Sequence, residues 1–187
     1  GEVARHDVQI QRAESCAVLT GIGTALADNP RLTVRDFPTL RPPLRILLDS
    51  RLRLPASSHL LDGSAPTLIY TLSDRPAPAG AAEICRLQAD AQGRLSLNAV
   101  LADLAAHGIG ELMLEAGATL GSTFLAQDLV DEIVCYQAPK LLGGTQSPTL
   151  FRLPENPAAL SREPDWHTVG IEQLGDDIKW VLQRRRG

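Results

Sequence analysis

The chain has 187 residues, a formal net charge of −4 and 4% aromatic residues. This length suits one domain with a substantial core, whereas the acidic balance and scattered aromatic residues argue against a nucleic-acid partner. No run of about 18 consecutive apolar residues is present, so we expect neither a membrane-spanning helix nor a membrane partner.

Helix-like and strand-like segments alternate along the chain. The expected helices are 2–15, 95–107 and 118–127, and the expected strands are 16–20, 44–48, 67–71, 112–114 and 132–136. Two late segments, 166–171 and 178–183, predict a hairpin around Gly175-Asp176. The alternation predicts an α/β fold with a mainly parallel open twisted sheet flanked by helices. We expect the closing hairpin to add antiparallel strands at one edge of this sheet.

The segment from Gly21 to Arg35 carries the first candidate site. It passes from a strand-like stretch through glycines into a short helix, and a Pro-containing loop then displays Leu32, Thr33 and Arg35. Backbone amides, hydroxyls and a guanidinium gathered in this way suit a phosphorylated ligand beside a cofactor. An ordinary strand-turn-helix join explains the same pattern equally well.

The segment from Glu111 to Leu125 carries the second candidate site. An apolar stretch ends in Glu115, and small residues then open a helix. Gly117 allows a close backbone approach, and the first helical amides from Ala118 onward are free to bind a pyrophosphate. The spacing matches neither the Rossmann fingerprint nor a P-loop, and a generic strand-to-helix join is the alternative.

Together the two segments resemble the reductase half of the bifunctional riboflavin-biosynthesis deaminase/reductase. The resemblance extends through residues 45–50, 129–133 and 138–144, in matching order and spacing. It implies a single reductase domain over residues 1–187 with a dihydrofolate-reductase-like fold. It also implies that NADPH reduces the ribosyl group of 5-amino-6-(5-phosphoribosylamino)uracil, a phosphorylated small molecule, to the ribityl product.

The resemblance also implies roles for individual residues. The expected substrate contacts are Arg12, Leu32, Arg35 and Glu115. The expected cofactor contacts are Thr24, Asp28, Ser50, Gly117, Ala118, Thr119, Leu120, Gly121, Ser122 and Thr123. We expect Arg35 to hold the ribose 5-phosphate, because a guanidinium forks onto two phosphate oxygens.

Several of these roles have a structural alternative. A solvated helix face would explain Arg12, and a surface ion pair with Asp36 or another acid would explain Arg35. Asp28 can simply end a turn, and ion pairing would account for Glu115.

Two arginines next to Ser50 bear on the choice between NADPH and NADH. Arg51 and Arg53 lie in the run 50–53 that directly follows the apolar stretch 44–49, where positive charge suits the adenosine 2′-phosphate. Two arginines at alternating positions would equally suit exposed residues of an edge strand. Of Ser50, Arg51 and Arg53, only Ser50 matches a position of the family.

The sequence departs from the family at its beginning. Family members open the reductase domain with a strand and a loop ahead of the first helix, whereas this sequence starts at Gly1, already at that helix. We therefore expect that strand, its loop and the zinc-binding deaminase domain to lie outside this sequence. Because the best candidates for the proton donor lie in that loop, the catalytic residue is left unassigned.

The cysteines indicate the cellular compartment. Cys16, Cys85 and Cys135 lie in or beside apolar runs, as expected of buried free thiols in a reducing cytoplasm. No C-x-x-C or His/Cys cluster is present, so we expect no metal site. The family resemblance suggests a homodimer.

Two other functions fit parts of the sequence. One is another pyridine-nucleotide reductase of the same fold, such as dihydrofolate reductase, which would need an apolar slot with aromatic walls. The dispersed Phe37, Phe124 and Phe151 do not readily supply it. The other is a nucleotide-binding module without catalysis.

Overall fold

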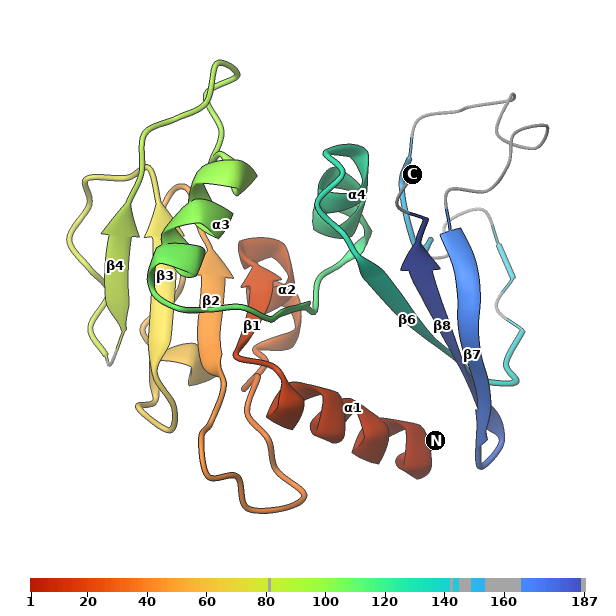
Figure 1. Ribbon diagram of the computed structural model, residues 1–187. Helices are drawn as coiled ribbons and strands as arrows, with labels where there is room; N and C mark the ends of the chain where they lie inside the picture. Colours follow the sequence, from red (N-terminus) through yellow and green to blue (C-terminus); the bar gives the residue numbers. More distant parts are fainter. Residues whose placement is uncertain (81, 142, 145–148, 154–165, 186–187) are drawn as a thin grey trace. The chain divides into compact units, whose positions relative to one another are not determined.

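The computed structural model describes residues 1–80, 82–141, 143–144, 149–153 and 166–185 (Figure 1). They divide into two compact units, which we call the parallel-sheet unit (Gln9–Gly117) and the antiparallel-sheet unit (Gly1–Val8 with Ala118–Gly187).

The elements follow one another in an α/β order. The helices are α1 (Glu2–Glu14), α2 (Ile22–Asp28), the short 3-10 helix η1 (His59–Leu61), α3 (Leu97–Ala106) and α4 (Ala118–Ala126). The strands are β1 (Ala17–Gly21), β2 (Leu44–Leu48), β3 (Thr67–Thr71), β4 (Glu83–Arg86), β5 (Leu112–Leu114), β6 (Glu132–Gln137), β7 (Trp166–Leu174) and β8 (Asp177–Arg184). Among the described residues, no helix is long and apolar enough to cross a membrane.

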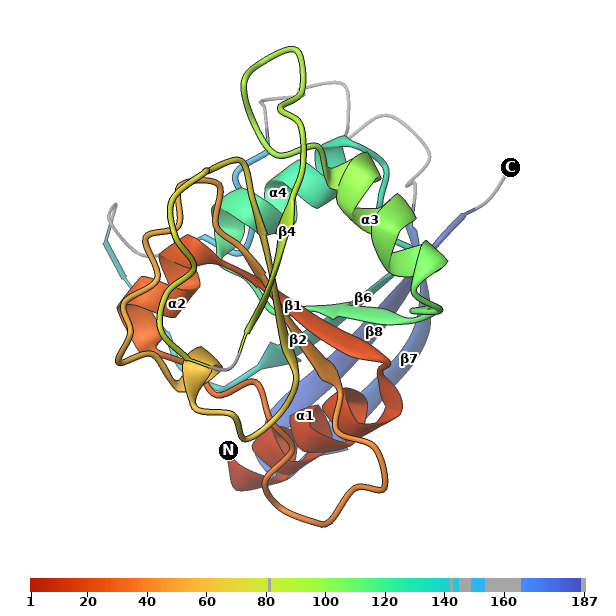
Figure 2. The ribbon, with the colours of Figure 1, turned by 90° about the vertical axis from the view of Figure 1, so that its left-hand side faces the viewer.

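The parallel-sheet unit is built on five parallel strands in the order β4-β3-β2-β1-β5. Strands β1 to β3 are buried along almost their whole length, which explains their nearly continuous apolar sequences. Helices α2 and α3 cover opposite faces of the sheet (Figure 2). Ala25 of α2 belongs to the core cluster on one face, whereas Asp103 of α3 accepts a 2.6 Å hydrogen bond from the buried Tyr70 of β3.

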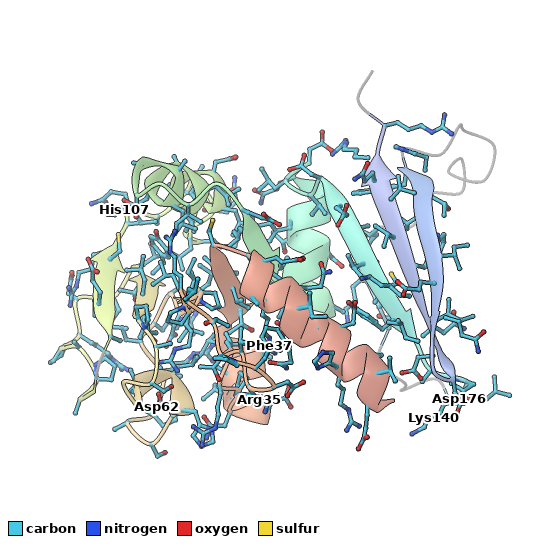
Figure 3. The ribbon with its side chains drawn as sticks, turned by 60° about the horizontal axis from the view of Figure 1, so that its bottom comes forward. Arg35, Phe37, Asp62, His107, Lys140 and Asp176 are labelled. Carbon is cyan, nitrogen blue, oxygen red and sulfur yellow. The ribbon has the colours of Figure 1, made fainter. Side chains whose placement is uncertain are left out.

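Arg45 is the charged exception in the apolar β2, and it is fully buried. Its guanidinium donates hydrogen bonds to the carbonyl oxygens of His59 (2.9 Å) and Ala65 (2.7 Å) and to Asp62 Oδ1 (3.2 Å). Burial lowers the pKa of Arg45, and Asp62 partly opposes that shift. Hydrogen bonds from Ser64, and then from Arg45, lower the pKa of Asp62 to about 2. Arg45 therefore ties β2 to the loop at η1. Asp62, which follows η1, is labelled in Figure 3.

The antiparallel-sheet unit contains α4 and a three-stranded sheet in the order β6-β8-β7. The β7–β8 hairpin turns at Gly175, whose φ of 67° suits glycine. Asp7, on the first part of α1, accepts hydrogen bonds from Tyr136 of β6 (2.5 Å) and Lys179 of β8 (2.7 Å). Burial alone raises the pKa of Asp7, but these two partners outweigh it, so the pKa lies below its usual value.

The expected fold class is confirmed, with differences in detail. The hairpin strands are longer than expected. The expectation that they extend an edge of the parallel sheet is wrong, because β7 and β8 form a separate three-stranded sheet in which β8 pairs with β6. Two elements, β4 and η1, were not predicted. The edge strand β4 was missed because it offers only Ile84 and Cys85 as apolar residues. The three cysteines are unpaired and half-buried. Leu142, within the resembling block 138–144, lies outside the described residues.

Candidate active site at the carboxyl edge of the parallel sheet

The strand order of the parallel sheet reverses beside β1. The chain runs from β1 through β2 and β3 to β4 on one side and then returns to place β5 on the other side of β1. In open α/β sheets, ligands bind outside the carboxyl ends of the strands at such a reversal. The carboxyl ends of β1 and β5 carry the two candidate segments that the sequence singled out.

A hydrogen bond joins these two segments. Thr24, in the first turn of α2 after β1, accepts a 3.3 Å hydrogen bond at Oγ1 from the backbone N–H of Gly117, which follows β5. A Cβ added at Gly117 would meet only Thr24 Oγ1, at 3.9 Å. The backbone of Gly117 therefore has an open side that a ligand can approach closely.

Glu115 lies at the same edge and is paired with Arg12 of α1. Arg12 donates from Nε to Oε1 (2.5 Å) and from Nη2 to Oε2 (2.6 Å). Arg12 is 8% exposed, so it is not a solvated residue of the helix face. The ion pair named above as an alternative for Glu115 is present. Because each carboxylate oxygen has two lone pairs, Glu115, whose side chain is 23% exposed, can still accept hydrogen bonds from a ligand.

The loop after α2 presents Arg35 and Leu32 in different ways. Arg35 is exposed, and Figure 3 shows it beside Phe37 in this loop. Leu32 is 2% exposed and packs in the core, so any contact of this residue with a substrate would come from its backbone. Its φ of 51° is rare for a bulky residue, and such backbones are concentrated at ligand sites.

The loop after β2 is held by Asp49, which the sequence analysis missed. Asp49 is fully buried, and its Oδ2 accepts hydrogen bonds from the backbone N–H groups of Arg53 (2.6 Å) and Leu54 (2.9 Å). Arg51 and Arg53 are exposed. A carboxylate at the end of a buried strand was the available signal, since a buried charge requires partners.

Asp28 is exposed and is the last residue of α2. Asn29 follows in the left-handed conformation and donates its backbone N–H to Ala25 O at 3.1 Å. The structure thus places Asp28 at a helix end, in agreement with the alternative that it ends a turn.

Within the antiparallel-sheet unit, α4 begins at Ala118, so its first amides have no acceptor inside the helix. Two of its hydroxyls already have partners: Ser122 Oγ accepts from Arg152 N (2.6 Å), and Thr123 Oγ1 donates to Thr119 O (2.9 Å). Gly121 is buried next to the ring of Phe151. Ala118, Thr119 and Leu120 are therefore the residues of this run best placed for a ligand.

No group of three or more metal-ligating side chains occurs among the residues that the structure describes. The donor set of the candidate site is instead one of backbone amides, hydroxyls, a carboxylate and arginines. This set suits a phosphorylated organic ligand.

Comparison with known proteins gives consistent results. The family described as the RibD C-terminal domain matches residues 1–180. The riboflavin biosynthesis protein RibD of Bacillus amyloliquefaciens is 36% identical over 186 residues, which cover 95% of this chain and 49% of that protein. The 5-amino-6-(5-phosphoribosylamino)uracil reductase of Buchnera aphidicola is 32% identical over 197 residues, which cover 98% of this chain and 93% of that protein.

A solved structure of Acinetobacter baumannii RibD superposes with a TM-score of 0.84 at 30% identity, covering 100% of this chain and 51% of that one. The chain thus spans about half the length of the RibD proteins that it matches.

Proposed function

Because this chain belongs to the RibD C-terminal domain family, we propose that it is the reductase of a riboflavin-biosynthesis step. In that step NADPH reduces the ribosyl group of 5-amino-6-(5-phosphoribosylamino)uracil to the ribityl group. The observation that carries the proposal is the meeting of the two candidate segments where the strand order reverses, through Thr24 and Gly117. The relatives' names support the reaction, and the open side of Gly117 suits a pyrophosphate.

NADPH supplies the hydride, and the chain's own residues bind and orient the reactants. In the parallel-sheet unit, the open side of Gly117 is suited to the pyrophosphate, and Thr24 can still donate its hydroxyl proton to a ligand. In the antiparallel-sheet unit, the first amides of α4 are by themselves suited to a phosphate group. Glu115 can accept hydrogen bonds from a uracil N–H or a ribose hydroxyl while it remains paired with Arg12. Arg35 is suited to the 5-phosphate.

The proposal extends to compartment and assembly. Unpaired cysteines fit a reducing cytoplasm, and the family resemblance supports a homodimer. Sedimentation of the purified protein tests the assembly, since a monomer across the working concentration range would remove that part of the proposal.

The Arg35→Ala variant is expected to weaken the binding of the phosphorylated substrate far more than the binding of NADPH. Loss of a charge-assisted, forked contact costs about 1.5–3 kcal/mol, or roughly ten- to a hundred-fold in affinity. Isothermal titration with ribose 5-phosphate and with NADPH measures both affinities. Arg31→Ala is the matched control, because Arg31 lies in the same loop and pairs with Asp62 at 3.0 Å. An equal loss for both ligands, or none, removes Arg35 from the phosphate role.

Removing both charges in Arg51→Ala/Arg53→Ala is expected to raise the KM for NADPH and to leave the KM for NADH nearly unchanged. The physical reason is that only NADPH carries the 2′-phosphate. The difference should shrink in high salt, because exposed charges are screened over about 10 Å at 0.1 M. A control variant, Arg41→Ala/Arg94→Ala, removes the same charge from other exposed positions. A parallel rise for both cofactors would mean that the two arginines support the fold instead.

A further inference from the structure

Gln9 is a buried polar residue with no role in the proposed site as described above. It lies on α1, is 4% exposed, and its side-chain Oε1 accepts a 3.1 Å hydrogen bond from the backbone N–H of Arg35. Arg12, three residues further along the same helix, donates from Nη1 to the carbonyl oxygen of Thr33 at 3.1 Å. Both ends of the segment 33–35 are therefore tied to one helix.

The same helix also holds the other side of the candidate site. Residues three apart lie on the same helix face, so Gln9 and Arg12 point in a common direction. Arg12 uses Nε and Nη2 on Glu115 and its remaining nitrogen on Thr33. Arg12 thus connects Glu115, which follows β5, with the loop that carries Arg35, and Gln9 adds a second contact between α1 and that loop.

The connection matters because the arginine side chain is long and flexible. An exposed guanidinium is pre-organised for a phosphate only if its backbone is fixed, since ordering the loop on binding would reduce the affinity. Gln9 is uncharged, so it adds no charge–charge attraction to a phosphate. The segment 33–35 lies within a loop between α2 and β2, where no strand pairing holds the backbone of Arg35.

We propose that Gln9 is a positioning residue that fixes the backbone of Arg35 and thereby sets the affinity for the 5-phosphate of the substrate. This inference rests on the proposed function, in which Arg35 binds that phosphate. It predicts that loss of the Gln9 acceptor weakens the binding of phosphorylated ligands alone, and that this effect requires Arg35.

The test is a double-mutant cycle with Gln9→Met and Arg35→Ala. Methionine has a similar length to glutamine but lacks the acceptor, so the Arg35 N–H loses its partner at little change in volume. Gln9→Met is expected to raise the KM of the phosphorylated substrate and the Kd of ribose 5-phosphate about three- to ten-fold. The kcat, the Kd of NADPH and the affinity for unphosphorylated ribose are expected to stay unchanged.

The cycle separates positioning from a purely structural role. In the Arg35→Ala background, Gln9→Met is expected to have no further effect on the Kd of ribose 5-phosphate. Gln11→Met is the matched control on the same helix, because two residues turn the helix by about 200° and so place Gln11 on another face. If Gln9→Met fails to fold, Gln9→Asn carries the same test, since its amide is one methylene too short to reach Arg35.

Three outcomes of the measurements on Gln9→Met would overturn the inference. The first is an unchanged Kd for ribose 5-phosphate in Gln9→Met, and the second is an equal loss of NADPH binding. The third is a Gln9→Met effect that persists in full when Arg35 is already alanine. If Arg35→Ala itself leaves phosphate binding intact, the phosphate role in the proposed function fails and this inference fails with it. A normal loss in Arg35→Ala with none in Gln9→Met overturns the inference about Gln9 alone.

Discussion

The Gly117→Val variant is expected to lose NADPH binding while the protein stays folded. A Cβ at Gly117 would contact only Thr24 Oγ1, at 3.9 Å, so the surrounding protein leaves room for a side chain. The same side chain would occupy the open side of the backbone that a pyrophosphate needs. Fluorescence titration with NADPH measures binding, and thermal unfolding followed by circular dichroism reports the fold.

Gly110→Val is the matched control for this variant. Gly110 precedes β5 at the amino end of the strand, and nothing lies within 4 Å of an added Cβ there. It carries the same added volume but lies away from the carboxyl edge of the sheet. NADPH binding should therefore persist in Gly110→Val. Retained binding in a folded Gly117→Val protein would place the cofactor elsewhere.

The Glu115→Ala variant is expected to cause the largest loss of stability. It leaves the guanidinium of Arg12, which is 8% exposed, without the carboxylate that takes two of its hydrogen bonds. Removing one partner of a buried pair costs about 3–5 kcal/mol, and the partial exposure of Glu115 favours the lower end of that range. Urea unfolding of the variant should show a drop in the free energy of unfolding of about 3 kcal/mol.

The double variant Arg12→Met/Glu115→Leu separates the two contributions. Replacing both charges by apolar residues leaves no uncompensated charge, so much of the lost stability should return. Substrate binding should not return, because the acceptor for the uracil or ribose is gone. Additive losses of stability in the double variant would show that the two residues do not act as a pair.

The fold was predictable where a short stretch of sequence carries the signal. Strands β1 to β3 are apolar runs bounded by loops, and the pair Gly175-Asp176 predicts the hairpin turn. β4 was missed because a short edge strand needs few apolar residues.

The site was predictable by its motifs but not by its internal contacts. The partner of Glu115 lies 103 residues away on α1, and no local pattern encodes such a pairing. The burial of Leu32 and the hydrogen bond from Arg35 to Gln9 also depend on how the loop returns to the sheet and to α1. For Asp49, a carboxylate at the end of a buried strand was a hint that was not used.

Turnover of 5-amino-6-(5-phosphoribosylamino)uracil by the purified protein is the most direct test of the proposed reductase function. NADPH oxidation is followed by the loss of absorbance of the reduced nicotinamide at about 340 nm, and the ribityl product is measured by mass spectrometry. One NADPH is expected to be oxidised for each ribityl product formed, with no oxidation when dihydrofolate replaces the substrate. NADPH binding without any turnover would contradict the reductase function and identify a nucleotide-binding module instead.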